Sequence, residues 1–413
     1  MSHTNITVYG AYWCPDCRRS KKFLGEQMVH FNWVDIEQDD AGRAFVEKIN
    51  HGKRIIPTIV FDDGSFLVEP SNAELAKKLG LQTQARMKFY DLIIVGGGPA
   101  ALTAAIYAAR EGIETLVIER STLGGQASIT EGLENFPGFP EGVSGAEFAE
   151  RVVKQARKFD VEILQAQDVD KVRVADEYRV VHTTDGSEYC AHAILIATGA
   201  DYRRLNVKGE DDFIGAGIHF CATCDGPFYK GAEQLVVIGG GNSAVEEGVF
   251  LTKFAKKVML LVRGKELTAS KVARDKIAEM SNMEVKYNTQ VQEFRGNGKL
   301  KTVVTKDTAS GATSELHPAA VFVFIGLNPN TGLVKDLAAL DPYGYILTGH
   351  DLAHAPMTPS SSSRERMPFA METSVPGIFA AGDARAGSTK QVASAVGEGA
   401  SAAIAIREYL KSE

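Results

Sequence analysis

Short apolar runs alternate with amphipathic stretches through the first part of the chain. The runs predict strands, and the spacing of apolar positions in the stretches between them predicts helices. Strands are expected at residues 6–9, 31–34, 58–61 and 65–68. Helices are expected at residues 14–28, 39–50 and 71–80, the last one capped by Ser71. This pattern indicates a compact α/β unit over residues 1–80, and the polar, aperiodic residues 81–88 are interpreted as a linker.

A different pattern begins after the linker, where a buried strand runs directly into a glycine-rich turn and a helix. Residues 90–95 form the strand and residues 96–101 the turn. The same design recurs at residues 235–238 and 239–244. Repetition of one strand–turn–helix unit is typical of a duplicated dinucleotide-binding fold. Residues 349–373 are polar and are expected to form an exposed loop.

Length and charge limit the classes of function. A chain of 413 residues has room for about three domains. The formal net charge of −7 argues against nucleic acid and against an anionic membrane as partners. No apolar stretch approaches the length of a membrane span, and the N-terminus lacks the pattern of a secretory signal, so we expect a cytoplasmic protein.

The first glycine-rich turn has the spacing of a pyrophosphate site. Gly96 permits a tight turn, Gly98 lets the backbone approach a phosphate, and Ala101 allows close packing of the helix. A helix N-terminus favours anions, because its first N–H groups have no partner within the helix. The next strand ends in Glu119, whose carboxylate can accept hydrogen bonds from a ribose. Together these features predict a nucleotide site rather than an ordinary strand–helix turn.

Four of the five cysteines form two Cys-x-x-Cys pairs, Cys14/Cys17 and Cys221/Cys224. In a reducing compartment such pairs are more often catalytic or metal-binding than structural. A zinc site needs four ligands, which these cysteines supply only by bridging two domains, so no metal is expected. Two redox pairs in one chain favour a relay in which one dithiol reduces the other. Cys190 stands alone and is expected to be a small buried hydrophobe.

The central pair lies in the motif Cys-Ala-Thr-Cys-Asp-Gly, residues 221–226. With its accompanying glycine motifs, the chain from Lys88 to the C-terminus closely resembles the low-molecular-weight thioredoxin reductases. Residues 1–80, with Cys-Pro-Asp-Cys at residues 14–17, resemble a glutaredoxin or mycoredoxin-like domain. The implied fold is α/β, with an N-terminal thioredoxin-like (glutaredoxin) domain followed by two Rossmann-like FAD- and NAD(P)-binding domains.

The resemblance also implies domain boundaries and FAD ligands. The implied domains are the glutaredoxin-like domain at 1–80, the linker at 81–88, the two parts of the FAD-binding domain at 89–203 and 328–413, and the NAD(P)H-binding domain with the redox dithiol at 204–327. The expected FAD ligands are Gly96, Gly98, Pro99, Ala100, Ala101, Glu119, Gly124, Gly125, Gln126, Asn135, Thr198, Gly199, Gly382, Asp383, Gln391 and Val392. The family usually has arginine where this chain has Lys390.

The second glycine-rich turn implies a nicotinamide coenzyme, with Gly239, Gly241, Asn242 and Ser243 as ligands. The strand after this turn is followed by Arg263, and a cation there suits the 2′-phosphate of NADPH. The family usually has a cluster of arginines here, whereas this chain has Gly264 and Thr268 at two of those positions. NADPH is the expected donor, with Lys265 or Lys271 as possible supporting cations. Weak discrimination against NADH, or a different donor, is the open alternative.

Family roles can be transferred to both dithiols. In the reductases, the residue matching Cys224 faces the flavin, the one matching Cys221 attacks the outgoing disulfide, and the one matching Asp225 manages protons. In the N-terminal unit, Cys14 would be the nucleophile at a helix N-terminus and Cys17 the resolving thiol. The same resemblance implies a cis Pro57 facing Cys14 and Cys17, and Arg18 and Arg19 are expected to add positive charge.

The leading interpretation is a fused disulfide reductase that passes electrons from NADPH through FAD and Cys221/Cys224 to Cys14/Cys17. The final acceptor would be thioredoxin, another small redox protein or a low-molecular-weight disulfide, and the related reductases imply a homodimer. One alternative is the reductase component of an alkyl hydroperoxide (peroxiredoxin) system. Another is a flavin and dithiol redox sensor with a degenerate NADPH site, supported by the reduced arginine cluster.

Overall fold

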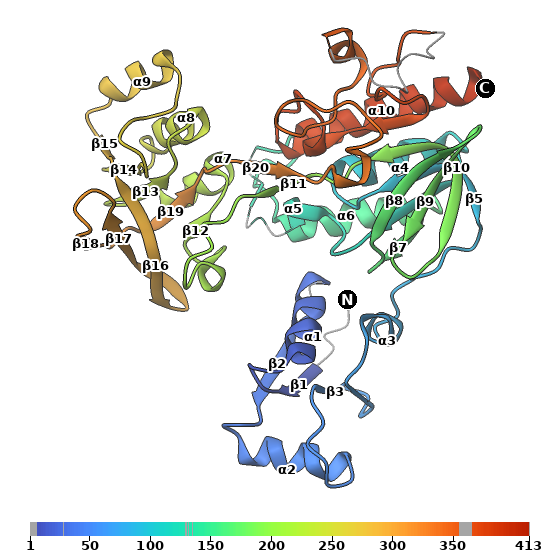
Figure 1. Cartoon of the computed structure of the whole chain (residues 1–413), viewed down its shortest axis with the longest axis horizontal. Coiled ribbons are helices and arrows are strands. Elements are labelled where there is room, and N and C mark those ends of the chain that lie inside the picture. The colour runs from blue at the N-terminus through green and yellow to red at the C-terminus, as the bar shows by residue number, and fades with distance from the viewer. Residues whose placement is uncertain are drawn as a thin grey trace. The chain divides into compact units, whose positions relative to one another are not determined.

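The computed structural model describes residues 6–27, 29–128, 130, 132–133, 135–354 and 366–412 (Figure 1). The chain divides into two compact units. Unit 1 comprises Met1–Gly125, Glu150–Thr198 and Thr331–Glu413. Unit 2 comprises Gln126–Ala149 and Gly199–Asn330. Each unit is built around parallel β-structure, and each is described separately below.

The N-terminal part of unit 1 is a four-stranded sheet in the order β2-β1-β3-β4. Its strands are β1 (Ile6–Gly10), β2 (Phe31–Asp35), β3 (Thr58–Val60) and β4 (Phe66–Val68). Its helices are α1 (Pro15–Glu26), α2 (Asp40–Ile49) and α3 (Asn72–Lys78). Alternate residues of β1, Ile6 and Val8, are fully buried in the core with Leu24 and Leu75. The strands and helices expected from the apolar pattern are confirmed, including Ser71 as the N-cap of α3.

The remainder of unit 1 contains a larger sheet, in the order β7-β6-β5-β10-β9-β8, with β21 paired to β10. Its strands are β5 (Phe89–Val95), β6 (Thr115–Glu119), β7 (Glu162–Gln165), β8 (Val169–Ala175), β9 (Tyr178–Thr183), β10 (Glu188–Ile196) and β21 (Ile378–Ala380). The pairs involving β5, β6, β7 and β21 are parallel, whereas β8 and β9 are antiparallel.

Both faces of this sheet are covered, so its central strands are continuously apolar. Leu92 and Ile94 of β5 belong to one core cluster, and Ile93 and Val95 belong to another. The first cluster is completed by α4 (Pro99–Arg110), α6 (Gly145–Lys158) and α10 (Val392–Ser412). The labelled ribbons of α4 and α10 can be followed near this sheet in Figure 1.

Residues 81–88 do not form a free linker along their whole length, because two of them, Gln82 and Arg86, bind Glu162 of β7, as does Tyr90 of β5. Its carboxylate accepts hydrogen bonds from Gln82 Nε2 at 2.7 Å, Arg86 N at 2.8 Å and Tyr90 Oη at 2.7 Å. Burial alone would raise the pKa of Glu162, but the hydrogen bonds from Tyr90 and Arg86 outweigh burial and hold this pKa below its usual value. The linker is therefore fastened to the sheet at a buried carboxylate.

Unit 2 contains a parallel sheet in the order β12-β19-β13-β14-β15. Its strands are β12 (Ile218–His219), β13 (Leu235–Ile238), β14 (Val258–Leu261), β15 (Met283–Lys286) and β19 (Ala320–Val323). The helices α7 (Ala222–Asp225), α8 (Asn242–Leu251) and α9 (Lys271–Ala278) accompany it. The unit also contains an antiparallel sheet of β16 (Thr289–Asn297), β17 (Lys299–Asp307) and β18 (Thr313–Leu316), and the pair β11 (Ala200–Tyr202) with β20 (Leu327–Pro329).

The polar segment 349–373 is only partly the exposed loop that its composition predicts. Its first residues form a short 3-10 helix, Gly349–His354, and residues 355–365 lie outside the described residues. At its end the prediction is wrong, because Glu372 and Thr373 are buried. The Glu372 carboxylate accepts two hydrogen bonds from Arg366, at 2.7 and 2.8 Å, so its charge is compensated.

Among the helices that the structure describes, none has the combination of length and apolar sequence needed to cross a membrane.

Candidate active site

The first glycine-rich turn connects β5 to α4 with backbone geometry that only small residues tolerate. Gly96 has φ +109°, and a Cβ there would lie 2.4 Å from the carbonyl oxygen of Ala197. Gly98 is the N-cap of α4, no side chain caps the helix, and its first turn has no acidic residue. Gly124 N donates to Gly97 O at 2.7 Å, which brings the Gly124–Gly125 turn against the same loop. The backbone N–H groups at this helix start suit a pyrophosphate.

Glu119 lies at the end of β6 beside this turn. Its carboxylate accepts hydrogen bonds from Gly97 N and, at 2.7 Å, from Ser121 N. The predicted acid therefore braces the glycine turn, and a carboxylate retains acceptor capacity beyond these bonds. The sequence prediction did not include this bracing role.

A second part of the candidate nucleotide site comes from the C-terminal segment. Because β10 and β21 are parallel, with Ile196 opposite Ala380, Thr198 and Gly382 follow their strands at the same sheet edge. Gly382 N donates to buried Glu398 Oε2 at 2.8 Å, and Arg385 binds the same carboxylate through two nitrogens at 3.0 Å each. Glu398 was missed by sequence reasoning, since a single acid within an alanine-rich helix carries no motif.

Asp383 follows Gly382 and is the acid expected to hold the flavin ribityl region. Burial raises the pKa of Asp383, Lys390 opposes that rise, and Glu398 adds to it. Lys390 Nζ donates to the carbonyls of Asp383 and Arg385, at 3.0 and 3.2 Å. The lysine that replaces the family's arginine therefore supports the Asp383 turn, and Gln391 and Val392 follow directly at the start of α10. Uncapped helix N–H groups, a small-residue turn and a partly buried acid at one sheet edge fit a dinucleotide such as FAD.

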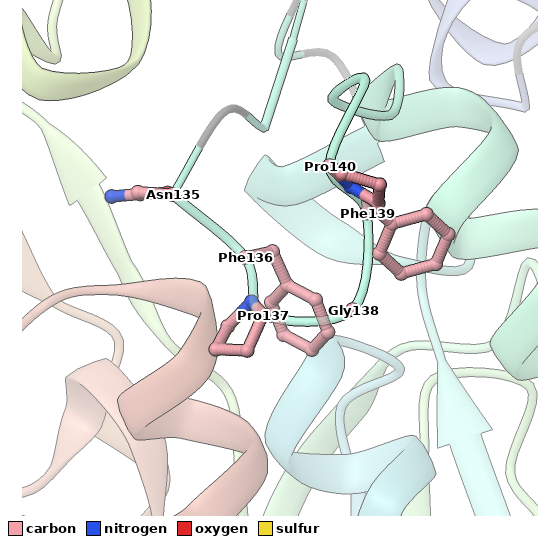
Figure 2. A pocket seen from close by; sticks show the side chains of 6 residues that line it. All are labelled: Asn135, Phe136, Pro137, Gly138, Phe139 and Pro140. Atoms are coloured by element: carbon pink, nitrogen blue, oxygen red, sulfur yellow. The ribbon is translucent and has the colours of Figure 1, made fainter.

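Gln126, Asn135 and Gly199 belong to unit 2, whereas the other expected FAD ligands belong to unit 1. Gln126 Nε2 donates to Asp201 Oδ1 at 3.3 Å. Residues 135–140 line a surface pocket (Figure 2), in which the Asn135 side chain points away from the rings of Phe136 and Phe139. The ring of Phe136 also lies 4.7 Å from that of Phe148, so aromatic packing shapes this loop.

The second glycine-rich turn repeats the first between β13 and α8. Gly239 has φ +149°, and a Cβ there would lie 2.3 Å from Phe324 O. Gly241 is the N-cap of α8 without a side-chain cap. The chain after β14 folds back onto this turn, because Thr268 N donates to Gly240 O at 2.8 Å and Ser270 N donates to Asn242 Oδ1 at 2.7 Å. Thr268 and Ser270 thus brace the turn, a role that their spacing does not reveal.

Arg263 and Ser243 are exposed at this turn, which is where a coenzyme ligand must be accessible. Arg263 makes no ion pair with the described residues, so its guanidinium is available to a phosphate. Lys265 and Lys271 are also exposed. This turn fits the pyrophosphate of a second dinucleotide, with cations beyond the strand for a further phosphate.

The central dithiol begins directly after β12. Cys221 is half-buried and disulfide-bonded, and Asp225 N donates to Cys221 O at 3.1 Å within the helical turn α7. The side chain of Cys224 lies outside the described part of the structure. Buried Asp225 approaches His219, a residue that the sequence prediction did not single out.

The N-terminal dithiol opens α1, with Cys14 as its N-cap. Cys14 Sγ accepts the N–H of Cys17 at 3.1 Å and lies 3.7 Å from Ile56 O. The Ile56–Pro57 peptide bond is cis, as predicted. Arg19 does not serve the dithiol directly, because it binds Asp16 at 2.5 Å and the Pro70 carbonyl at 2.7 Å.

The two N-terminal thiols are not equivalent. Burial, followed by the hydrogen bond to Cys14, raises the pKa of Cys17 to about 12. A thiol with such a pKa remains protonated near neutral pH, and the protonated form is a poor nucleophile. This asymmetry supports Cys14 as the attacking thiol and Cys17 as the resolving thiol.

We expect iodoacetamide at pH 8 to alkylate Cys14 well before Cys17 in the reduced protein, because alkylation requires thiolate. Tandem mass spectrometry of the peptide that carries both cysteines locates the first adduct. In the Cys14→Ser variant this peptide should remain almost unmodified over the same time. An adduct that forms first on Cys17 would contradict the assignment.

Two segments of the chain match known protein families. Residues 90–399 match the family of pyridine nucleotide-disulphide oxidoreductases, and residues 6–66 match glutaredoxin. The thioredoxin reductase of Bacillus subtilis (strain 168) is 40% identical over 325 residues, covering 78% of this chain and 96% of that protein. The thioredoxin reductase of Treponema pallidum (strain Nichols) is 41% identical over 322 residues, 78% of this chain and 97% of that protein.

Solved structures agree with these matches. The thioredoxin reductase of Streptococcus pyogenes MGAS5005 superimposes with a TM-score of 0.69 at 37% identity, covering 79% of this chain and 99% of that one. Enzymes of the thioredoxin reductase family use FAD and NADPH, which suits the two dinucleotide turns. The chain therefore belongs to the pyridine nucleotide-disulphide oxidoreductases, as a flavin-dependent disulfide oxidoreductase of the thioredoxin reductase type that carries an N-terminal glutaredoxin domain.

Proposed function

We propose that this enzyme is a self-contained disulfide reductase, in which electrons from NADPH pass through FAD to Cys221/Cys224 and then to Cys14/Cys17. The observation that carries this proposal is the presence in one chain of two Cys-x-x-Cys pairs, one on the reductase part and one on the glutaredoxin part. Bound FAD would convert hydride transfer into thiol chemistry, and the chain would hold and orient the reacting groups.

The proposal assigns a direction to the two dithiols. Cys221/Cys224 would be the upstream pair, because it follows β12 in the unit that also holds the second dinucleotide turn. Cys14/Cys17 would be the downstream pair, with Cys14 attacking the substrate disulfide and Cys17 resolving the mixed disulfide. The domain boundaries 1–80, 81–88, 89–203, 204–327 and 328–413 and the ligand residues named from the sequence are part of this proposal.

The outgoing partner is proposed to be a small thioredoxin-like protein or a low-molecular-weight disulfide, and the active form a homodimer. Relatives named thioredoxin reductase support the first inference. The side chains beside Cys14 also support it, because Tyr12 is 62% and Trp13 is 66% exposed, and exposed aromatic side chains are favoured at protein interfaces.

Anaerobic titration tests the upstream half of this path. NADPH should bleach the oxidised flavin absorbance at stoichiometric amounts, and NADH titrated in parallel measures the discrimination between the two coenzymes. A flavin that stays oxidised under excess NADPH would overturn the reductase proposal. It would instead favour the redox-sensor alternative.

Arg263→Ala is expected to raise the KM for NADPH about tenfold, since a charge-assisted hydrogen bond to phosphate contributes about 1.5–3 kcal/mol. The KM for NADH should change little, because NADH lacks the 2′-phosphate. Steady-state kinetics with both coenzymes provides the measurement. The control for loss of an exposed cation is Lys299→Ala, since Lys299 lies on β17, outside both glycine-rich turns. Equal KM changes for the two coenzymes would argue against contact between Arg263 and the 2′-phosphate.

A further inference from the structure

Beside the central dithiol, three polar side chains of unit 2 lie next to one another. The imidazole of His219 lies between Asp225 and Tyr229. Its Nδ1 is 3.5 Å from Asp225 Oδ2, and its Nε2 is 2.7 Å from Tyr229 Oη. The side chains of His219 and Asp225 are only 3% and 10% exposed, whereas Tyr229 is half-buried. The three side chains therefore lead from a buried carboxylate to a half-buried tyrosine.

The packing around His219 holds this alignment. The imidazole lies 5.3 Å from the ring of Phe322 on β19 and 5.4 Å from the ring of Tyr229. Phe322 carries no charge. Among the side chains that the structure describes, the titratable groups in contact with His219 are Asp225 from α7 and Tyr229 from the following 3-10 turn, Gly226–Tyr229. A buried imidazole is costly to place unless its polar atoms find partners. Here Nε2 is hydrogen-bonded to Tyr229 at 2.7 Å, and Nδ1 lies within ion-pair distance of Asp225, at 3.5 Å.

We propose that His219 relays protons between Asp225 and Tyr229 during turnover of the Cys221/Cys224 dithiol. The relay rests on the proposed function, because it needs Asp225 to exchange protons with that dithiol. His219 acts through its contact with Asp225, so it is assigned as a positioning and proton-transfer residue. Its separation from Asp225 by five intervening residues hides the pairing in the sequence, and the fold brings the two together.

The two half-reactions require opposite proton movements. Reduction of the disulfide takes up two electrons and one proton, breaks the S–S bond and leaves one thiol and one thiolate. The proton would come from Asp225. His219 would then reprotonate Asp225 with its Nδ1 proton and receive a proton from Tyr229 at Nε2. The hydroxyl of Tyr229 recovers a proton from solvent.

Oxidation of the dithiol by an external disulfide reverses this movement. The thiolate attacks one substrate sulfur, the second cysteine closes the internal disulfide, and two substrate thiolates leave with the two electrons. The proton of the second cysteine passes to Asp225 and then to His219 Nδ1, while the Nε2 proton leaves through Tyr229. One proton enters and one leaves per cycle, and the imidazole alternates between its two neutral tautomers.

The test uses His219→Gln in the full-length, FAD-loaded enzyme, with NADPH as donor and 5,5′-dithiobis(2-nitrobenzoate) as the disulfide probe. Stopped-flow absorbance separates flavin reduction by NADPH from turnover of the dithiol. We expect flavin reduction to be unchanged and dithiol turnover to slow about tenfold, a part of the 10²–10⁴-fold that general acid–base catalysis provides. The pH dependence of dithiol turnover should also weaken. Tyr229→Phe, which keeps the ring but removes the hydroxyl, should slow the same step by a smaller factor.

A double-mutant cycle distinguishes a relay from a packing role. If His219 acts through Asp225, the variant with both His219→Gln and Asp225→Asn should be no slower than Asp225→Asn alone. His182→Gln is the matched control, since His182 also faces a carboxylate, Asp170 at 2.6 Å, but lies outside the nucleotide and dithiol elements. In this control, both flavin reduction and dithiol turnover should proceed at the wild-type rates.

The outcomes are separable. Unchanged dithiol turnover in His219→Gln, or an additive loss in the double variant, would overturn the relay. A wild-type flavin that NADPH cannot reduce would instead overturn the proposed function on which the relay rests. Flavin content and the midpoint of thermal unfolding identify a variant that is merely misfolded, and Tyr229→Phe then carries the test.

Discussion

The double variant Cys14→Ser/Cys17→Ser is expected to take up two two-electron equivalents per chain in an anaerobic titration, whereas the wild type takes up three. In the proposed path, one equivalent resides on FAD and one on each dithiol. Serine cannot form a disulfide, so the variant loses the two-electron equivalent that the Cys14/Cys17 disulfide accepts. Turnover with a protein disulfide such as insulin should fall about a thousandfold, because removal of a catalytic nucleophile commonly has effects of this size or larger.

The matched control is the single variant Cys190→Ser. Cys190 is a free, half-buried cysteine on β10 and belongs to neither dithiol. This variant should retain all three equivalents and full turnover. In the double variant, the rate of flavin reduction by NADPH should match the wild type, since that step precedes both dithiols. Undiminished insulin reduction by the double variant would show that the glutaredoxin domain is dispensable and that the central dithiol delivers electrons directly.

Gly399→Ala should destabilise the flavin-binding part of unit 1 by about 2 kcal/mol, the typical cost of overpacking a close contact. Gly399 lies on α10, where a Cβ would meet the Ala100 carbonyl oxygen at 2.2 Å and Ala100 Cα at 3.1 Å. Both atoms are backbone at the start of α4, so no side chain can rotate away. The added Cβ would push the start of α4 out of place. Because this helix start belongs to the turn proposed to hold the pyrophosphate, we expect weaker FAD retention as well.

Urea unfolding followed by flavin fluorescence measures both effects, because flavin is released when the flavin-binding part of unit 1 unfolds. Gly397→Ala is a closely matched control on the same helix. Gly397 is exposed and a Cβ there meets nothing within 4 Å, so alanine should stabilise the helix by about 0.5–1 kcal/mol. Equal midpoints for the two variants would show that α10 and α4 can separate without cost.

The elements of secondary structure were predictable because their signals are local. The apolar run of β5 and the glycines after it identify a strand, a turn and a helix within about twenty residues. The capping residue Ser71 is equally local, since its partner Glu74 is three residues away. Where the signal was compositional, as in residues 349–373, the prediction failed at Glu372, which a bidentate contact with Arg366 allows to be buried.

The sequence by itself determined the two dithiols, the two glycine-rich turns and the order of the elements that carry them. Tertiary structure alone decided which side chains support those motifs: Glu398 holding Gly382, Thr268 closing on Gly240, and His219 joining Asp225 to Tyr229. The physical reason is that motifs record what the local backbone requires, such as a glycine where a Cβ would collide. A hydrogen-bond partner for a buried polar group is instead found wherever packing brings a donor and an acceptor within about 3 Å.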